Sequence, residues 1–241
     1  MEEMKLFISI PSNRDWKGRF GASLAGLISH LMGSGVKGKK CTNFFVRAWG
    51  NASCLPEARQ KFVDEMMAGN YTHWLSLDDD MTFPIDIVER LAAHDKDIVA
   101  VNARHKTSEI KGSLLDFNGN PIDSTDKTSI EPVLAMGGAI FLAKIDSFRH
   151  IPRPHFEVRW IPKDNAYLSE DRYFANLLHI NGIEMWCDHD TSKLVTHIGD
   201  FEYGWPDASS AKTSVPQQEA SSDKAPEVFK GGLTLINGKA A

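Results

Sequence analysis

Three consecutive carboxylates, Asp78, Asp79 and Asp80, are the residues of this sequence best suited to chemistry. They follow the apolar run Trp74 to Leu77, which is typical of a buried strand. Residues i and i+2 of an extended strand point the same way, so we expect Asp78 and Asp80 to project together and Asp79 to face elsewhere. Two convergent carboxylates favour Mg²⁺ or Mn²⁺, shared with the phosphates of a nucleotide.

The Asp-x-Asp spacing is weak evidence by itself, because Asp-Lys-Asp at 95–97 and Asp-His-Asp at 188–190 share it. Context distinguishes the first cluster, which alone ends an apolar strand. Three carboxylates packed there without a cation would repel one another. The alternative is a solvated acidic turn that caps the following helix. We favour the cation site.

The chain around this cluster alternates strand-like and helix-like segments. The expected strands are Lys5 to Ile10, Asn43 to Trp49, His73 to Leu77 and Ile98 to Val101. The expected helices cover Ser23 to Met32 and begin again at Leu55 and at Pro84. This order predicts an α/β fold with a Rossmann-like, mostly parallel central sheet flanked by helices. Ligands of such sheets bind beyond the carboxyl ends of the strands, where the aspartates lie.

The rest of the chain completes one domain. Lys106 to Pro132 is polar and turn-rich, Ser169 to Leu178 predicts a helix, and Ile183 to Cys187 and Leu194 to Ile198 predict short strands. We assign residues 1–200 to this single domain and 201–241 to a C-terminal tail, partly disordered, because its composition shifts to small and polar residues.

Bulk composition excludes several classes of protein. The net charge of −5 argues against non-specific nucleic-acid binding, which needs a basic surface. Three widely spaced cysteines indicate neither a disulfide framework nor a zinc cluster. No segment approaches the roughly 20 apolar residues of a membrane span, and no signal peptide is evident. We therefore expect a cytoplasmic protein.

The stretch Trp74 to Pro84 resembles the metal-binding segment of GT-A glycosyltransferases, especially family 2-like enzymes of microbes and their viruses. Further segments resemble that family in the order it uses, over about residues 4 to 200. These are the donor-base loop at Ile8-Ser9-Ile10-Pro11, the nucleotide-contacting helix at Ala58-Arg59, the glycine turn at Gly137-Gly138-Ala139, the acidic pair Glu170-Asp171 and the late histidine at His197-Ile198-Gly199.

The resemblance implies roles for these residues. Asp80 would be the main metal ligand, Asp78 would bind the ribose or a metal-bound water as well as the metal, and His197 would be a further ligand. An imidazole among carboxylates favours Mn²⁺ over Mg²⁺. The donor nucleotide-sugar would be held by Ser9, Pro11, Arg59, Asp78, Asp79 and Gly138.

Each assignment has a structural alternative. His197 would otherwise be a core or loop histidine bonded to backbone, and Arg59 an exposed surface arginine. Gly138 would allow a tight turn in place of close approach to a sugar. For the catalytic base we expect Asp171 or Glu170, with Asp171 the better match to inverting enzymes of the family. Their alternative is a pair of first-turn acids behind a Ser169 N-cap. Stereochemistry stays open between inversion and retention.

The sequence thus predicts a metal-dependent glycosyltransferase that moves a sugar from a nucleotide-diphosphate donor, UDP-linked by analogy, to an acceptor hydroxyl. The acceptor is open between a glycan, a protein, a small molecule and modified DNA. One alternative is a nucleotidyltransferase, although the early glycine-rich phosphate loop of those enzymes is missing. The other is an inactive nucleotide- or carbohydrate-binding module, which the joint presence of Asp78, Asp80, Glu170, Asp171 and His197 disfavours.

Overall fold

A computed structural model describes residues 4–12, 15–33, 44–49, 54–107, 109–199 and 202–205. Most of the predicted tail, residues 206–241, lies outside the described residues. None of the helices within the described ranges is long and apolar enough to cross a membrane.

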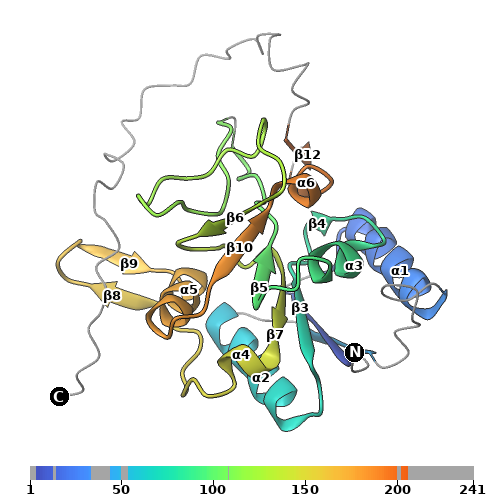
Figure 1. Cartoon of the computed structure of the whole chain (residues 1–241), viewed down its shortest axis with the longest axis horizontal. Coiled ribbons are helices and arrows are strands. Elements are labelled where there is room, and N and C mark those ends of the chain that lie inside the picture. The colour runs from blue at the N-terminus through green and yellow to red at the C-terminus, as the bar shows by residue number, and fades with distance from the viewer. Residues whose placement is uncertain are drawn as a thin grey trace.

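A seven-stranded sheet with the strand order β2-β1-β3-β7-β5-β10-β6 forms the centre of the fold (Figure 1). Its strands are β1 Leu6–Pro11, β2 Phe44–Trp49, β3 His73–Leu77, β5 Ile98–Ala100, β6 Ile130–Val133, β7 Ile140–Lys144 and β10 Met185–Asp188. The strands β1, β2, β3, β5 and β10 run the same way, whereas β6 and β7 are antiparallel to their neighbours. The predicted α/β fold with a mostly parallel sheet is confirmed.

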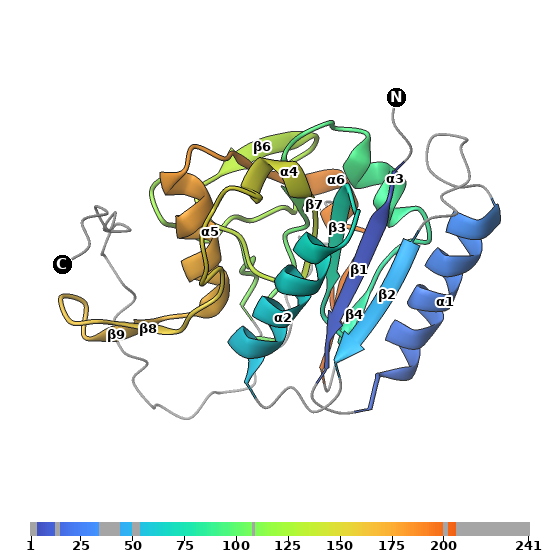
Figure 2. The ribbon, with the colours of Figure 1, turned by 90° about the horizontal axis from the view of Figure 1, so that it is seen from below.

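Helices cover both faces of this sheet (Figure 2). They are α1 Gly18–Gly33, α2 Leu55–Ala68, α3 Ile87–Ala92, α4 Ile145–Phe148, α5 Glu170–Ile180 and α6 His189–Ser192. Side chains alternate along β1, so Leu6, Ile8 and Ile10 pack with α1 and α3, while Phe7 packs with α2, α4 and α5. Both faces of β1 are therefore buried, as expected for a strand inside a parallel sheet.

Two predicted helices begin elsewhere than expected. The first begins at Gly18 rather than Ser23, because Phe20 adds another buried position to its apolar face. The third begins at Ile87 rather than Pro84, since a turn closed by the bond from Ile87 N to the Pro84 carbonyl precedes it.

A small second sheet, absent from the sequence prediction, lies beside the aspartates. It has the order β12-β11-β4, with β4 Met81–Thr82, β11 Thr196–Ile198 and β12 Glu202–Tyr203. The predicted strand Leu194 to Ile198 is thus shorter and belongs to this sheet rather than to the central one. Trp205, just past β12, is buried and donates from Nε1 to the Asn102 carbonyl at 2.8 Å. The domain's packing therefore includes residues beyond 200.

A third sheet is the hairpin of β8 Arg159–Ile161 and β9 Ala166–Leu168, which extends from the body next to α5 (Figure 2). Its Trp160 and Tyr167 rings lie 5.0 Å apart and are 44% and 70% exposed. Trp160 is therefore a surface residue and not part of the core.

Candidate active site

The three aspartates lie where β3 ends, and each has a different partner. Asp78 accepts a hydrogen bond from Arg59 Nη2 at 3.1 Å, and Asp79 accepts one from Ser12 Oγ at 2.5 Å. Asp80 forms an ion pair with Lys106. Since β1 and β3 are parallel neighbours, Ser12 follows β1 at the same sheet edge. The cluster thus joins the carboxyl ends of two strands, as expected for a ligand site in such a sheet.

Strand alternation does not extend through the cluster as predicted. β3 ends at Leu77, and residues 79 and 80 form a turn, so the rule for residues i and i+2 no longer applies. Asp79 nevertheless turns away toward Ser12, and the Asp78 and Asp80 carboxylates remain close enough to repel each other. The expected grouping is observed, although its geometric reason was wrong.

His197 lies directly beside Asp80. The strand β11 pairs with β4 so that His197 is opposite Met81, and Ile198 N donates to the Asp80 carbonyl at 2.7 Å. The distance from His197 Nε2 to Asp80 Oδ2 is 3.3 Å. The pairing of β11 with β4 thereby brings these two distant parts of the chain together at the predicted site.

The ring of His197 is fixed from its other side. Its Nδ1 lies 3.0 Å from the Arg104 carbonyl, which can only accept, so Nδ1 carries the proton. Nε2 faces the Asp80 carboxylate, where it can donate as part of an imidazolium or, in a neutral ring, offer its lone pair to a cation bound between the two residues. The Asp80–His197 pair therefore suits a borderline-hard cation such as Mn²⁺ as an oxygen and nitrogen ligand set.

The structure does not bring the three predicted metal ligands, Asp78, Asp80 and His197, together in one group. Among the described residues, no group of three or more histidine, cysteine or acidic side chains is placed to hold a metal ion. Asp78 is engaged by Arg59, so Asp80 and His197 are the two protein ligands that the geometry offers. Further oxygen ligands for a cation would come from water and from the phosphates of a bound ligand.

The two carboxylates have opposite electrostatic environments. Desolvation raises the pKa of Asp78 to about 7, and the Arg59 guanidinium opposes this rise. Desolvation also acts on Asp80, but hydrogen bonds from His197 and Lys106 outweigh it and lower the pKa of Asp80 to about 2. Asp80 is therefore a permanent anion near neutral pH, whereas Asp78 titrates there.

Arg59 is a buried residue, so the surface-arginine alternative is wrong. It is 3% exposed and lies under Gly138, with its guanidinium 5.8 Å from the Phe156 ring centre. Its Nε is 3.8 Å from Glu170 Oε1, and neither Nε nor Nη1 has a hydrogen-bond partner in the described part of the chain. A buried guanidinium with unused donors beside a partly exposed carboxylate is suited to an anionic ligand.

The packing of Arg59 leaves no room for a side chain at residue 138. A Cβ at residue 138 would lie 1.7 Å from Arg59 Nη1. The close backbone approach that glycine allows is therefore made by Arg59 in this structure.

The acidic pair begins α5, and its two members differ. Glu170 points to Arg59, whereas Asp171 Oδ1 accepts from Ser169 Oγ and from Arg172 N at 2.7 Å. Ser169 is the N-cap residue but makes no side-chain capping bond to the helix, so its hydroxyl orients Asp171 instead. Asp171 also contributes to the electrostatic field at Asp78. Among the described residues, Asp171 Oδ2 has no hydrogen-bond donor.

Two predicted donor-binding residues are held in the core. Ser9 is fully buried, and its Oγ accepts from Trp74 Nε1 at 2.7 Å. Pro11 is buried at the end of β1 opposite Trp49. The structure therefore does not bring the Ser9 side chain to the aspartates, because strand alternation turns it to the face covered by α2. Sequence reasoning missed Ser12, which follows Pro11 and does reach the cluster.

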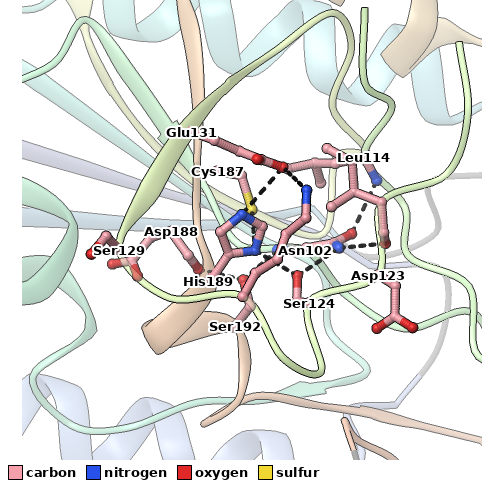
Figure 3. Close-up of polar contacts among 12 residues, drawn as sticks. Asn102, Leu114, Asp123, Ser124, Ser129, Glu131, Cys187, Asp188, His189 and Ser192 are labelled. Atoms are coloured by element: carbon pink, nitrogen blue, oxygen red, sulfur yellow. Dashed lines mark hydrogen bonds and ion pairs between the residues drawn. The ribbon is translucent and has the colours of Figure 1, made fainter. Parts of the chain in front are cut away.

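Asp188 and His189, from the third Asp-x-Asp match, belong to a separate buried polar cluster (Figure 3). Asp188 caps α6 by accepting from Thr191 N at 2.9 Å. His189 Nδ1 lies 2.9 Å from Ser124 Oγ, and its Nε2 is 3.3 Å from Glu131. Ser124 and His189 are at most 1% exposed, so this serine, histidine and glutamate arrangement is closed to a substrate and is structural.

Asn102 also belongs to this cluster (Figure 3). Its Nδ2 donates to the Ile122 carbonyl and to Ser124 Oγ, both at 2.8 Å, and its Oδ1 accepts from Leu114 N at 3.1 Å. Because Asn102 follows β5, these bonds anchor the segment that carries Arg104 and Lys106 to the site.

Comparison with known proteins identifies the fold. The sequence matches no protein-family model and no curated protein. Among solved structures, A197 from STIV matches with a TM-score of 0.54 and 16% identity, over 90% of this chain and 100% of A197. GalNAc-T7, solved with UDP, GalNAc and Mn²⁺, matches with a TM-score of 0.50 and 14% identity, over 91% of this chain and 46% of its own. The chain thus spans less than half of GalNAc-T7, and it has a GT-A-like fold.

Proposed function

We propose that this protein is a metal-dependent glycosyltransferase that moves a sugar from a UDP-linked donor to an acceptor hydroxyl. The observation that carries the proposal is the pairing of Asp80 with His197 at the carboxyl end of β3, with Nδ1 of the histidine held by the Arg104 carbonyl. The structure of GalNAc-T7, which shares the fold, was solved with UDP and Mn²⁺, and this supports the choice of nucleotide and cation.

The residues of the site divide into a donor side and an acceptor side. On the donor side, Asp80 and His197 would hold the cation, which neutralises charge on the leaving diphosphate. Arg59 would place its positive charge beside the anionic donor, and Asp78 would accept from the ribose. Asp79, tied to Ser12, fixes the turn between them.

On the acceptor side, Asp171 is proposed as the base. Its Oδ2 would take the proton of the acceptor hydroxyl while that oxygen bonds to the anomeric carbon and the bond from this carbon to the diphosphate breaks. Ser169 and the Arg172 amide hold the other oxygen and orient the carboxylate. Glu170, which faces Arg59, would position the guanidinium rather than transfer a proton.

Nucleotide release from a panel of UDP-, GDP-, CMP- and dTDP-sugars tests this function. We expect Mn²⁺-dependent release from a UDP-sugar, loss of release in EDTA, and loss in Asp80→Ala. Calorimetry on the same samples measures donor binding. Binding without release would favour the inactive binding module, and absence of both would reject the glycosyltransferase.

A further inference from the structure

The Lys106 ammonium contacts the same Asp80 oxygen to which a cation would bind. Its Nζ contacts Asp80 Oδ2, and His197 Nε2 faces the same oxygen at 3.3 Å. An ammonium and a divalent cation on one carboxylate oxygen would repel each other strongly, so both cannot remain there. The geometry therefore requires Lys106 to move whenever a cation binds between Asp80 and His197.

The backbone that carries Lys106 is anchored, but the side chain is free to move. Arg104 pairs with Gly112 in an isolated bridge, and its Nη1 donates to the Gly204 carbonyl at 3.1 Å. Thr107 N donates to the His105 carbonyl at 2.8 Å. The Lys106 side chain is 37% exposed, and its four-carbon stem can swing without disturbing these bonds.

A displaced ammonium needs a new anion. The diphosphate of a donor bound at Asp80 would supply one within the reach of Lys106, since the same cation would hold its oxygens. An ammonium with three donors suits phosphate oxygens. Lys106 would thus weaken binding of the cation alone and strengthen binding of the cation together with the donor.

Resting on the proposed function, we propose that Lys106 is a diphosphate-binding residue that occupies the cation's place on Asp80 until the donor arrives. It makes binding of metal and nucleotide cooperative, because the nucleotide removes the residue that competes with the metal. The site is thereby protected from binding a cation without its substrate.

Calorimetry of the full chain with Mn²⁺ alone, and with UDP at saturating Mn²⁺, tests this role. Lys106→Met keeps most of the apolar stem and removes the charge. We expect it to bind Mn²⁺ alone roughly three- to tenfold more tightly, and UDP with Mn²⁺ roughly tenfold more weakly. Lys106→Arg, which keeps a positive charge, should retain most of the UDP affinity.

Lys111→Met is the matched control, because Lys111 pairs with Glu109 on the surface. It should behave as wild type in both titrations. If Lys106→Met binds Mn²⁺ and UDP as wild type does, the inference is wrong while the proposed function stands. If the wild-type protein binds neither, the proposed function fails and this inference fails with it. Circular dichroism of each variant confirms that it is folded.

Discussion

The guanidinium of Arg59 lies against the backbone of Gly138 so closely that a methyl group at residue 138 would come within 1.7 Å of Nη1. The same guanidinium donates to Asp78 at 3.1 Å. The glycine turn, the helix α2 and the first aspartate are therefore one packed unit. A substitution at any of the three positions should alter the donor side of the site.

Gly138→Ala tests this unit. The new methyl group should push the guanidinium away from Asp78, lower the free energy of unfolding by about 1–3 kcal/mol and weaken UDP binding. Urea denaturation and calorimetry measure the two effects. The control is Gly21→Ala in α1, where a Cβ meets nothing within 4 Å and stability should hold or rise. Equal behaviour of the two variants would contradict the role given to Gly138.

Cation binding should depend on pH through Asp78. Desolvation raises the pKa of this carboxyl to about 7, whereas the pKa of Asp80 is about 2. Protons therefore compete at Asp78 between pH 6 and 8, and the negative charge that attracts the cation is lost as the pH falls below about 7. We expect Mn²⁺ affinity to fall by up to about tenfold per pH unit below 7 and to level off above it.

Asp78→Asn provides the comparison for that titration. Its Mn²⁺ affinity should be lower than that of wild type at pH 8 but should vary much less between pH 6 and 8, because the amide does not titrate. A wild-type affinity that is constant over this range would show that Asp78 does not influence the cation.

Substitutions of the two acidic residues of α5 should have different effects. Asp171→Asn should lower nucleotide release by about 10²–10⁴-fold and leave UDP affinity near wild type, because a base acts in the chemical step. Glu170→Gln should instead lower stability and UDP affinity, since the buried Arg59 loses a carboxylate at 3.8 Å. Release assays, calorimetry and denaturation distinguish them. The reverse pattern would assign the base to Glu170.

The buried His189 should destabilise the protein in mild acid. Desolvation lowers its pKa below the ordinary 6.5, against the opposing effect of Glu131. The unfolded chain then binds more protons than the folded one below about pH 6.5, so stability falls there by up to about 1.4 kcal/mol per pH unit. His189→Asn should be less stable at pH 7.5 yet lose less between pH 7.5 and 5.5 in urea denaturation. An unchanged loss would exclude His189 as a cause.

The sequence could predict those parts of the fold that depend on local patterns. The strand His73–Leu77 was predicted with its observed bounds because an apolar run lies between a Gly-Asn turn and the aspartates. The two-residue strand Met81–Thr82 could not be found, since two residues have no measurable alternation. The place of His197 at the site therefore came from the family resemblance and not from periodicity, and the small sheet that brings it to Asp80 was not predicted.

The partners of the aspartates were not predictable from local patterns either. Ser12 and Asp79 are 67 residues apart, and Lys106 and Asp80 are 26 apart. Such pairs form where separate strand ends meet in the folded chain, and no spacing rule covers them. The burial of Arg59 has the same origin, because it depends on the missing side chain of Gly138.

Binding of UDP in Mn²⁺ and in EDTA, measured by calorimetry on wild type, Asp80→Asn and Asp95→Asn, tests the central claim most directly. Asp95 belongs to the second Asp-x-Asp match and lies exposed beside Lys144, and asparagine tolerates its positive φ, so it is a matched control. We expect Mn²⁺-dependent binding that Asp80→Asn weakens by at least about tenfold and Asp95→Asn leaves unchanged. UDP binding that is equal in EDTA, or that survives in Asp80→Asn, would contradict a cation held by Asp80 and His197.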